Sequence, residues 1–274
     1  FRPFIYNLAG SLDLPGNVSN TTEGVRVKIN TSCPTEAEKF IELIKEKKPL
    51  PALIEKIEFE QIPYEDIKGF NIDKTIKNGN GFQLISPDIA TCSNCVEDIM
   101  DPDNTGRYHY PFTNCTNCGP RFTIIREMPY DRPATVMDRF KMCDDCNTEY
   151  NDPADRRFHA QPNACVKCGP RMELIDGSGN IIDNKEPLAT AAKMLIDGKI
   201  IGIKSLGGFQ IACDARSDKA VKRLRDRKLR PSKPFAIMAG NISWINQYYH
   251  LGPLESSILG SSRAPIVLLR KKTG

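Results

Sequence analysis

The chain has 274 residues, of which 40% are hydrophobic and 26% are charged, and its formal net charge is +4. This composition excludes global disorder and provides enough apolar material for two or three packed domains. No apolar run approaches the roughly 20 residues of a membrane-spanning helix, and the N-terminus lacks the layout of a secretory signal. We therefore expect a cytoplasmic protein. Because FRPFIYNLAG has no initiator Met, we also expect further residues before Phe1.

Residues 1–77 alternate helix-like and strand-like segments and are expected to form a small α+β domain. Apolar residues at helical spacing predict helices over 2–12 and 35–48. Apolar residues that fit the faces of strands predict strand structure within 16–30 and over 53–62.

Eight of the ten cysteines form four Cys-x-x-Cys pairs within 78–174, a segment with few periodic apolar stretches. Successive pairs are separated by 19 residues in the first set and by 18 in the second, a spacing typical of four-thiolate tetrahedral zinc sites. Such a closed site leaves no position for substrate, so two structural Zn²⁺ ions are predicted to stabilise this module. Redox-active dithiols are the alternative. The eight predicted ligands are Cys92, Cys95, Cys115, Cys118, Cys143, Cys146, Cys165 and Cys168.

The cysteine-rich segment contains an internal repeat. The stretch that begins at Cys92 matches the one that begins at Cys143 at an offset of 50 to 51 residues. Both copies contain Asp-Pro, then Arg-aromatic-His, then Cys-x-x-Cys-Gly-Pro-Arg. Since four thiols already complete each site, His109 and His159 are interpreted as packing and hydrogen-bonding residues, with contact to a substrate as the alternative.

Beyond residue 175 the pattern returns to alternating helices and strands. The predicted elements are a helix over 187–197, a strand over 199–204, helices over 218–227 and 254–260, and strands over 235–238 and 266–269. The stretch 216–233 holds nine Lys or Arg against two Asp, a local charge of 9 − 2 = +7. This cluster indicates a site for phosphates, with a solvated helix face as the alternative.

FRPFIYNLA together with GNVSNTTEGVRV resembles the helix-opening and second-strand motifs of acylphosphatases. The resemblance implies a ferredoxin-like domain that hydrolyses acyl phosphates, with Arg2 binding the phosphoryl group and Asn20 orienting the attacking water. A helix N-terminus favours an anion, and an arginine adds a bidentate donor, which suits that role. The first strand of the family and the glycine-containing start of its phosphate loop would precede Phe1.

KLRPSKPFAIM resembles the Lys-x-Arg and Lys-Pro motif of the YrdC family, and IKSLGGFQIACDA resembles the first strand and turn of that domain in hydrogenase maturation proteins. The resemblance implies the N-terminal half of a twisted α/β domain over 175–274. Such a domain binds ATP with Mg²⁺ and forms carbamoyl-type adenylates, which requires cations around the triphosphate. The matching positions are Lys204, Gly207, Gly208, Lys228, Arg230 and Lys233.

The order of the three parts resembles the HypF carbamoyltransferases of [NiFe] hydrogenase maturation over essentially the whole chain. The resemblance implies an α+β multidomain protein with an acylphosphatase-like domain, a double zinc module and a partial YrdC-like domain. It also implies hydrolysis of carbamoyl phosphate, capture of the carbamate by ATP as carbamoyl adenylate, and transfer of the carbamoyl group to the C-terminal cysteine of a HypE-like partner. The transferred group becomes a cyanide ligand of the hydrogenase iron.

Two alternatives belong to other classes of protein. A YrdC-type threonylcarbamoyl-adenylate synthase for tRNA shares the adenylation chemistry, and the YrdC-like fold also has a likeness to binders of double-stranded RNA. Neither explains the acylphosphatase-like segment or the eight paired cysteines. A zinc-ribbon nucleic-acid binder would explain the cysteines and the basic cluster, but 216–233 has no interleaved aromatic residues.

Overall fold

The computed structural model divides by its contacts into two compact units, Phe1–Gly169 and Pro170–Gly274. The predicted domain boundary at residues 77 and 78 lies outside the described residues. None of the helices in the described part combines the length and the apolarity that a bilayer crossing demands. The structure describes residues 1–272 except 22–23, 50–51, 74–84, 129 and 184.

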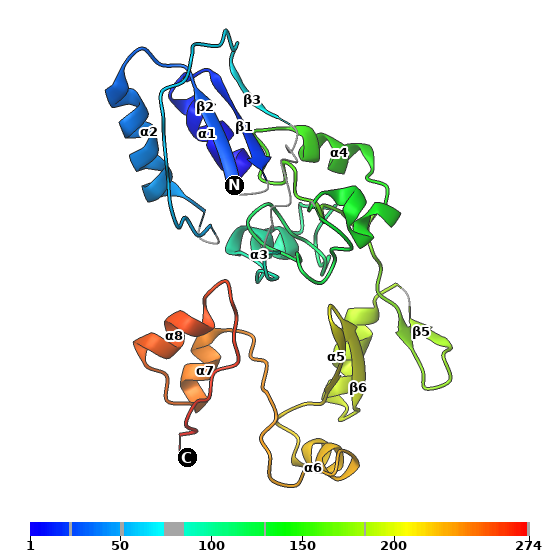
Figure 1. The fold of residues 1–274 in the computed structure, drawn as a ribbon. Helices are drawn as coiled ribbons and strands as arrows, with labels where there is room; N and C mark the ends of the chain where they lie inside the picture. Colours follow the sequence, from blue (N-terminus) through cyan, green and yellow to red (C-terminus); the bar gives the residue numbers. More distant parts are fainter. Residues whose placement is uncertain (22–23, 50–51, 74–84, 129, 184, 273–274) are drawn as a thin grey trace. The chain divides into compact units, whose positions relative to one another are not determined.

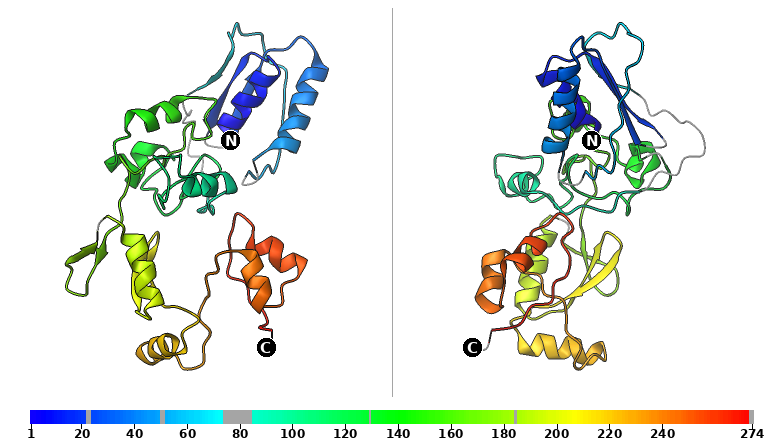
Figure 2. Two further views of the ribbon diagram at one scale, coloured as in Figure 1. Left: turned by 180° about the vertical axis from the view of Figure 1, so that it is seen from behind. Right: turned by 60° about the vertical axis from the view of Figure 1, so that its left-hand side comes forward.

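The first unit begins with α1 (Arg2–Ser11), β1 (Gly16–Thr21), β2 (Gly24–Ile29), α2 (Pro34–Lys47) and β3 (Phe70–Ile72). β1 is the central strand, antiparallel to β2 and parallel to β3. Helices α1 and α2 lie on one face of this sheet (Figures 1 and 2). This order of helix, hairpin, helix and strand is the ferredoxin-like order from its first helix onward, as the resemblance implied.

One apolar core holds these helices against the sheet. Ile5, Leu8 and Ala9 recur at helical spacing on α1, and all three are buried. They pack with Val18 of β1 and Phe40 of α2. Burial of one large apolar side chain contributes about 1.5–3 kcal/mol. The core therefore fixes the N-terminal end of α1 close to the C-terminal end of β1.

The predicted strand over 53–62 is wrong. Leu53 and Phe59 are 83% and 75% exposed, whereas Ile54 and Ile57 pack against the core. The two packed residues are three positions apart, which does not match the period of two that a strand requires. The strand that follows α2 is instead β3, whose three residues are too few for an alternating pattern to stand out.

The cysteine module, residues 85–169, has little regular structure. Helices α3 (Ser93–Met100) and α4 (Asp144–Asn151) each start directly after the first cysteine of a repeat. Two short 3-10 helices, η1 (Arg132–Ala134) and η2 (Val136–Arg139), lie between the repeats in the sequence. Much of the buried interior consists of cysteines and polar side chains, so this module depends on ligands and hydrogen bonds for its stability.

The second unit contains two antiparallel strand pairs, β4 with β5 and β6 with β7. The predicted helices over 187–197, 218–227 and 254–260 correspond to α5, α6 and α8, and the strand over 199–204 corresponds to β6. The elements are β4 (Leu174–Ile175), β5 (Ile181–Asp183), α5 (Pro187–Ile196), β6 (Ile201–Ser205), β7 (Gly208–Ala212), α6 (Asp218–Arg227), α7 (Ile242–Tyr248) and α8 (Pro253–Leu259).

The predicted strands over 235–238 and 266–269 are not strands in this structure. Within the described part of the chain neither segment has a ladder partner. Met238 and Leu268 are 93% and 89% exposed. An apolar run of strand length forms a strand only when a neighbour accepts and donates its backbone hydrogen bonds, and no such neighbour is placed beside either run.

Replacement of Ile5 by Ala should destabilise the N-terminal core by about 2–5 kcal/mol, because Ile5 is fully buried and its loss leaves a cavity. Hydrogen exchange of the amides of α1 and β1 reports this local stability. The control is Ile62→Ala, at a side chain that is mostly outside the core, which should change exchange by less than about 0.5 kcal/mol. Equal protection in the two variants would contradict the assigned core.

Candidate functional site

The eight predicted cysteine ligands form two clusters, each made by one repeat. Within each cluster the four Sγ atoms lie within 4.8 Å of one another. Neighbouring Sγ atoms are 3.6–3.8 Å apart in the first cluster and 3.7–3.8 Å apart in the second. A disulfide would bring two sulfurs to about 2.05 Å, so the thiols are free.

These separations match tetrahedral metal coordination. Four sulfurs at about 2.3 Å from a central Zn²⁺ lie about 3.8 Å from each other. The sulfurs therefore already have the separations that coordination of a Zn²⁺ ion requires. The donor set is four soft thiolates, which suits Zn²⁺ and leaves no open coordination position.

The two repeats share an unusual backbone feature. His109 and His159 both have positive φ angles, 55° and 53°. Their N–H groups donate to the carbonyl oxygens of Ile99 and Tyr150 at 2.8 and 3.0 Å, one helical turn beyond the second cysteine of each repeat. The repeated histidine is thus explained in part by its backbone, because His is among the residues that tolerate a left-handed conformation.

Buried ion pairs cross between the repeats. Arg107 of the first repeat donates to both carboxylate oxygens of Glu149 in the second, at 2.8 and 2.5 Å. Arg157, the counterpart of Arg107, pairs with Asp98, the counterpart of Glu149. Both arginines are buried. The pairing is therefore reciprocal, and neither repeat completes its own charge balance.

The same crossing reaches the cysteine sulfurs. Arg156 donates to Sγ of Cys95 at 3.1 Å, and Arg107 approaches Sγ of Cys146 at 3.8 Å. A four-thiolate site with a divalent ion carries a net charge of about −2, which such donors offset. Each predicted metal site is thus supported by arginines that the other repeat supplies.

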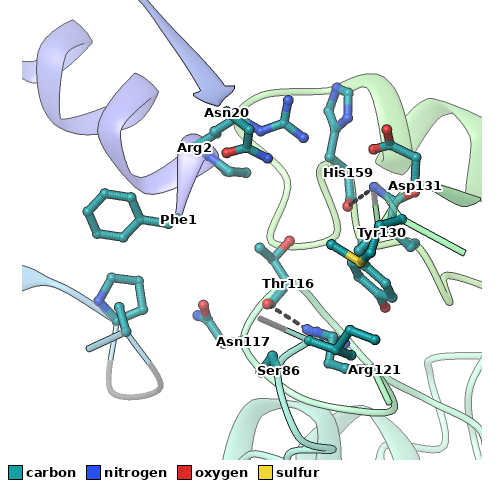
Figure 3. Close-up of a pocket in the computed structure, with 17 residues that line it drawn as sticks. Phe1, Arg2, Asn20, Ser86, Thr116, Asn117, Arg121, Tyr130, Asp131 and His159 are labelled. Atoms are coloured by element: carbon teal, nitrogen blue, oxygen red, sulfur yellow. Dashed lines mark hydrogen bonds between the residues drawn. The ribbon is translucent and has the colours of Figure 1, made fainter. Parts of the chain in front are cut away.

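A pocket of about 360 Å³ lies in the first unit, between the N-terminal α/β part and the cysteine module (Figure 3). Its walls include both residues that the acylphosphatase resemblance indicated, Arg2 and Asn20. The module contributes residues that precede η1 in the sequence and residues that follow it. They include Thr116, Asn117, Arg121, Tyr130, Asp131 and His159.

Arg2 and Asn20 reach the pocket from the ends of neighbouring elements. Arg2 is the first residue of α1, and Asn20 lies in the last part of β1. Within the described part of the chain neither side chain forms a hydrogen bond, so a guanidinium and an amide are available to a ligand. The N-terminus of a ten-residue helix adds a partial positive charge beside them.

The wall that the module supplies was missed by sequence reasoning. Arg121 is buried, and its Nη2 donates to the carbonyl oxygen of Thr116 at 2.9 Å. Its guanidinium also lies 5.6 Å from the ring centroid of Tyr130. A fixed cation therefore faces the pocket from this side. Its position in the repeated Cys-Gly-Pro-Arg motif was the only sequence signal, and that motif indicated the metal site instead.

His159 has a perturbed environment in this pocket. Burial lowers the pKa of His159, and the positive charge of Arg2 lowers it further, while Asp131 acts in the opposite direction. The imidazole is therefore neutral at pH 7 and offers one donor and one acceptor. Its ring packs against Tyr150, with centroids 5.2 Å apart, and Phe158 before it contacts Tyr6 of α1.

The predicted nucleotide residues lie on two segments of the second unit. Lys204 belongs to β6, and its Nζ lies 4.7 Å from the ring centroid of Phe209. Gly207 lies in the β6–β7 turn, and Gly208 is the first residue of β7; their φ angles, 84° and 152°, are ones that residues other than glycine rarely adopt. The turn thus has the backbone freedom that the sequence predicted.

The second segment follows α6. Arg225 donates to the carbonyl oxygens of Arg230 and Lys233, and Arg230 donates to that of Pro234. Two of the arginines that contribute to the local charge of +7, Arg225 and Arg230, therefore stabilise this loop through hydrogen bonds. The amino groups of Lys228 and Lys233 have no hydrogen-bond or ion-pair partner among the described residues, which leaves them available to an anionic ligand.

Sequence models of three families match successive parts of the chain. The acylphosphatase model matches residues 1–72, the HypF finger model matches 91–125 and 142–175, and the telomere recombination model, which covers the Sua5, YciO and YrdC proteins, matches 193–274. Carbamoyltransferase HypF of Synechocystis sp. is 47% identical over 273 residues, which are 99% of this chain. Nearly the whole chain is homologous to HypF proteins.

Other HypF proteins match the chain to a similar extent. HypF of Rhodobacter capsulatus is 40% identical over 98% of this chain. A crystal structure of full-length HypF in the phosphate- and nucleotide-bound form matches 100% of the chain with a TM-score of 0.90 and 42% identity. T. kodakarensis HypF matches 99% with a TM-score of 0.79 and 43% identity. The chain covers 35–36% of these proteins, about a third of their length.

Removal of an arginine should weaken the metal site of the opposite repeat. Arg107→Ala should lower the Zn²⁺ affinity of the cluster that begins at Cys143, and Arg156→Ala that of the cluster that begins at Cys92, by about 10–100-fold. Competition with a chromogenic chelator measures both affinities. Lys167→Ala is the control, since this exposed residue lies between two ligands without bonding them. A loss confined to the cluster of the mutated repeat would contradict the crossed arrangement.

The titration of His159 should respond to its two charged neighbours in opposite directions. Arg2→Ala should raise its pKa towards the ordinary value of about 6.5, and Asp131→Ala should lower it further. An NMR titration of the three histidines measures these shifts. Because the unfolded chain takes up a proton near pH 6.5 and folded His159 only at lower pH, its contribution destabilises the fold as pH falls through this window. An unchanged pKa in both variants would contradict the pocket geometry.

Proposed function

We propose that this chain forms the acylphosphatase, zinc and nucleotide-binding parts of a HypF carbamoyltransferase. The observation that carries the proposal is 40–47% identity to HypF proteins across 98–99% of the chain. In this proposal the acylphosphatase part spans residues 1–77, the zinc part 78–174 and the nucleotide-binding part 175–274. The eight reduced cysteines suit a reducing compartment, so we place the protein in the cytoplasm.

The first step of the proposed function is hydrolysis of carbamoyl phosphate in the pocket beside α1. Water attacks phosphorus, the bond between phosphorus and the bridging oxygen breaks, and carbamate leaves with the electron pair. Both protons of the water remain on the product, dihydrogen phosphate. Arg2 and the N-terminus of α1 bind the phosphoryl oxygens, and the amide of Asn20 orients the water.

The second step is adenylation of carbamate in the second unit. A carbamate oxygen attacks the α-phosphorus of ATP, and pyrophosphate leaves, which gives carbamoyl adenylate. Mg²⁺ enters with ATP and neutralises charge on the phosphates. Lys204, Lys228 and Lys233 supply further positive charge, and the Gly207-Gly208 turn allows the backbone to approach the nucleotide.

The zinc ions have a structural part in this proposal. Each would be held by the four cysteines of one repeat and would supply folding free energy rather than a reactive position. The carbamoyl group would then pass to the C-terminal cysteine of a HypE-like partner. Binding of tRNA or another nucleic acid has less support, because the comparisons place a HypF finger and an acylphosphatase part beside the YrdC-like part.

Conversion of ATP to AMP and pyrophosphate by the full-length protein should depend on carbamoyl phosphate. Arg2→Ala and Lys228→Ala should each abolish it, the first by stopping the supply of carbamate and the second by weakening ATP binding. Pyrophosphate release measures the reaction. Lys219→Ala, a basic position on α6, is the control.

Ammonium bicarbonate, which contains carbamate at equilibrium, separates the two steps. It should restore pyrophosphate release to the Arg2 variant and not to the Lys228 variant. ATP that remains intact under all conditions would exclude the adenylation step. Conversion of ATP at a rate that depends on neither carbamoyl phosphate nor bicarbonate would favour a different acyl donor.

A further inference from the structure

The pocket beside α1 is lined by cationic groups and by groups that accept hydrogen bonds. Arg2, Asn20 and the helix N-terminus provide donors and positive charge from the α/β part. Asp131 and His159 line the same pocket from the cysteine module, and Figure 3 shows their side chains next to each other. A carboxylate repels the phosphoryl group of an acyl phosphate, so Asp131 is unsuited to direct contact with that group.

Asp131 has no structural partner that would explain it. It is the N-cap residue of η1, yet its side chain makes no capping hydrogen bond. Within the described residues no side chain or backbone group forms an ion pair or hydrogen bond with its carboxylate, although the side chain is half-buried. Its negative charge acts on both Arg2 and His159, which places the carboxylate near the two of them.

The internal repeat shows what is particular to His159. His109 has the same left-handed backbone and the equivalent backbone hydrogen bond, but it is exposed, stacks on Tyr108 and does not line the pocket. The left-handed backbone therefore accounts for both histidines, but of the two it is the imidazole of His159 that lines the pocket. That imidazole packs against Tyr150 and forms no hydrogen bond with the described part of the chain.

We propose that Asp131 and His159 recognise the carbamoyl end of the substrate and make the hydrolytic site selective for it. This inference rests on the proposed function. The carbamoyl group carries an NH₂ with two donors, and a carboxylate and a neutral imidazole are acceptors for them. Acetyl phosphate has the same phosphoryl group and a methyl in place of the NH₂. A site built around those donors rejects the methyl analogue because its polar groups are then left unpaired.

The test compares kcat/KM for carbamoyl phosphate with kcat/KM for acetyl phosphate in the full-length protein. Asp131→Ala should lower the ratio of the two by about 10–100-fold, because a hydrogen bond to a charged acceptor is lost only with the NH₂ substrate. His159→Asn, which keeps a residue tolerant of positive φ, should lower it by about 5–10-fold. Loss that is equal for both substrates would make the two residues merely structural and would overturn the inference.

Asp138→Ala and His109→Asn are the matched controls. Asp138 lies on η2 outside the pocket lining, and His109 is the repeat counterpart of His159. Both controls should keep the ratio of the unchanged protein. Retained turnover of acetyl phosphate and full zinc content identify a variant that is folded, and His159→Asn decides alone if Asp131→Ala loses zinc.

The two proposals fail in different ways. Failure of the unchanged protein to hydrolyse either acyl phosphate would overturn the proposed function and this inference with it. Hydrolysis of carbamoyl phosphate with a ratio that neither variant changes would overturn this inference and leave the proposed function standing.

Discussion

Arg107 and Arg157 each leave their own repeat and pair with the carboxylate of the other. A buried guanidinium without its partner would cost about 3–5 kcal/mol, so neither repeat is stable in this conformation alone. His159 follows Arg157 by two residues, and Arg121 follows the last cysteine of the first cluster by three. The crossed ion pairs therefore fix the metal clusters and, through them, the wall of the pocket that the module supplies.

This dependence gives the metal clusters an indirect part in chemistry. Closed four-thiolate sites have no reactive position, yet they hold the loops that carry pocket residues. The α/β part supplies a cation and a helix N-terminus, and the module supplies the cation Arg121 together with a carboxylate and a neutral imidazole. One pocket thus combines groups that suit a phosphoryl group with groups that accept hydrogen bonds.

The sequence was most informative where the structure depends on local spacing. Cys-x-x-Cys pairs fix two ligands each within one turn, so both clusters followed from spacing alone. Arg2 and Asn20 are eighteen positions apart, and only the family resemblance joined them. Asp131 belongs to no motif, and His159 was interpreted as a packing residue because the repeat makes it equivalent to His109. The pocket distinguishes those two histidines, and a pocket made by distant segments leaves no local pattern.

The crossed arginines also constrain the order in which the protein can mature on the ribosome. The first cluster has all four thiols once Cys118 has emerged, but Arg156, which donates to its Cys95 sulfur, is made 38 residues later. A metal ion captured early would lie in a site whose charge is not yet balanced. The first site therefore has its full set of supporting donors only once the second repeat is in place.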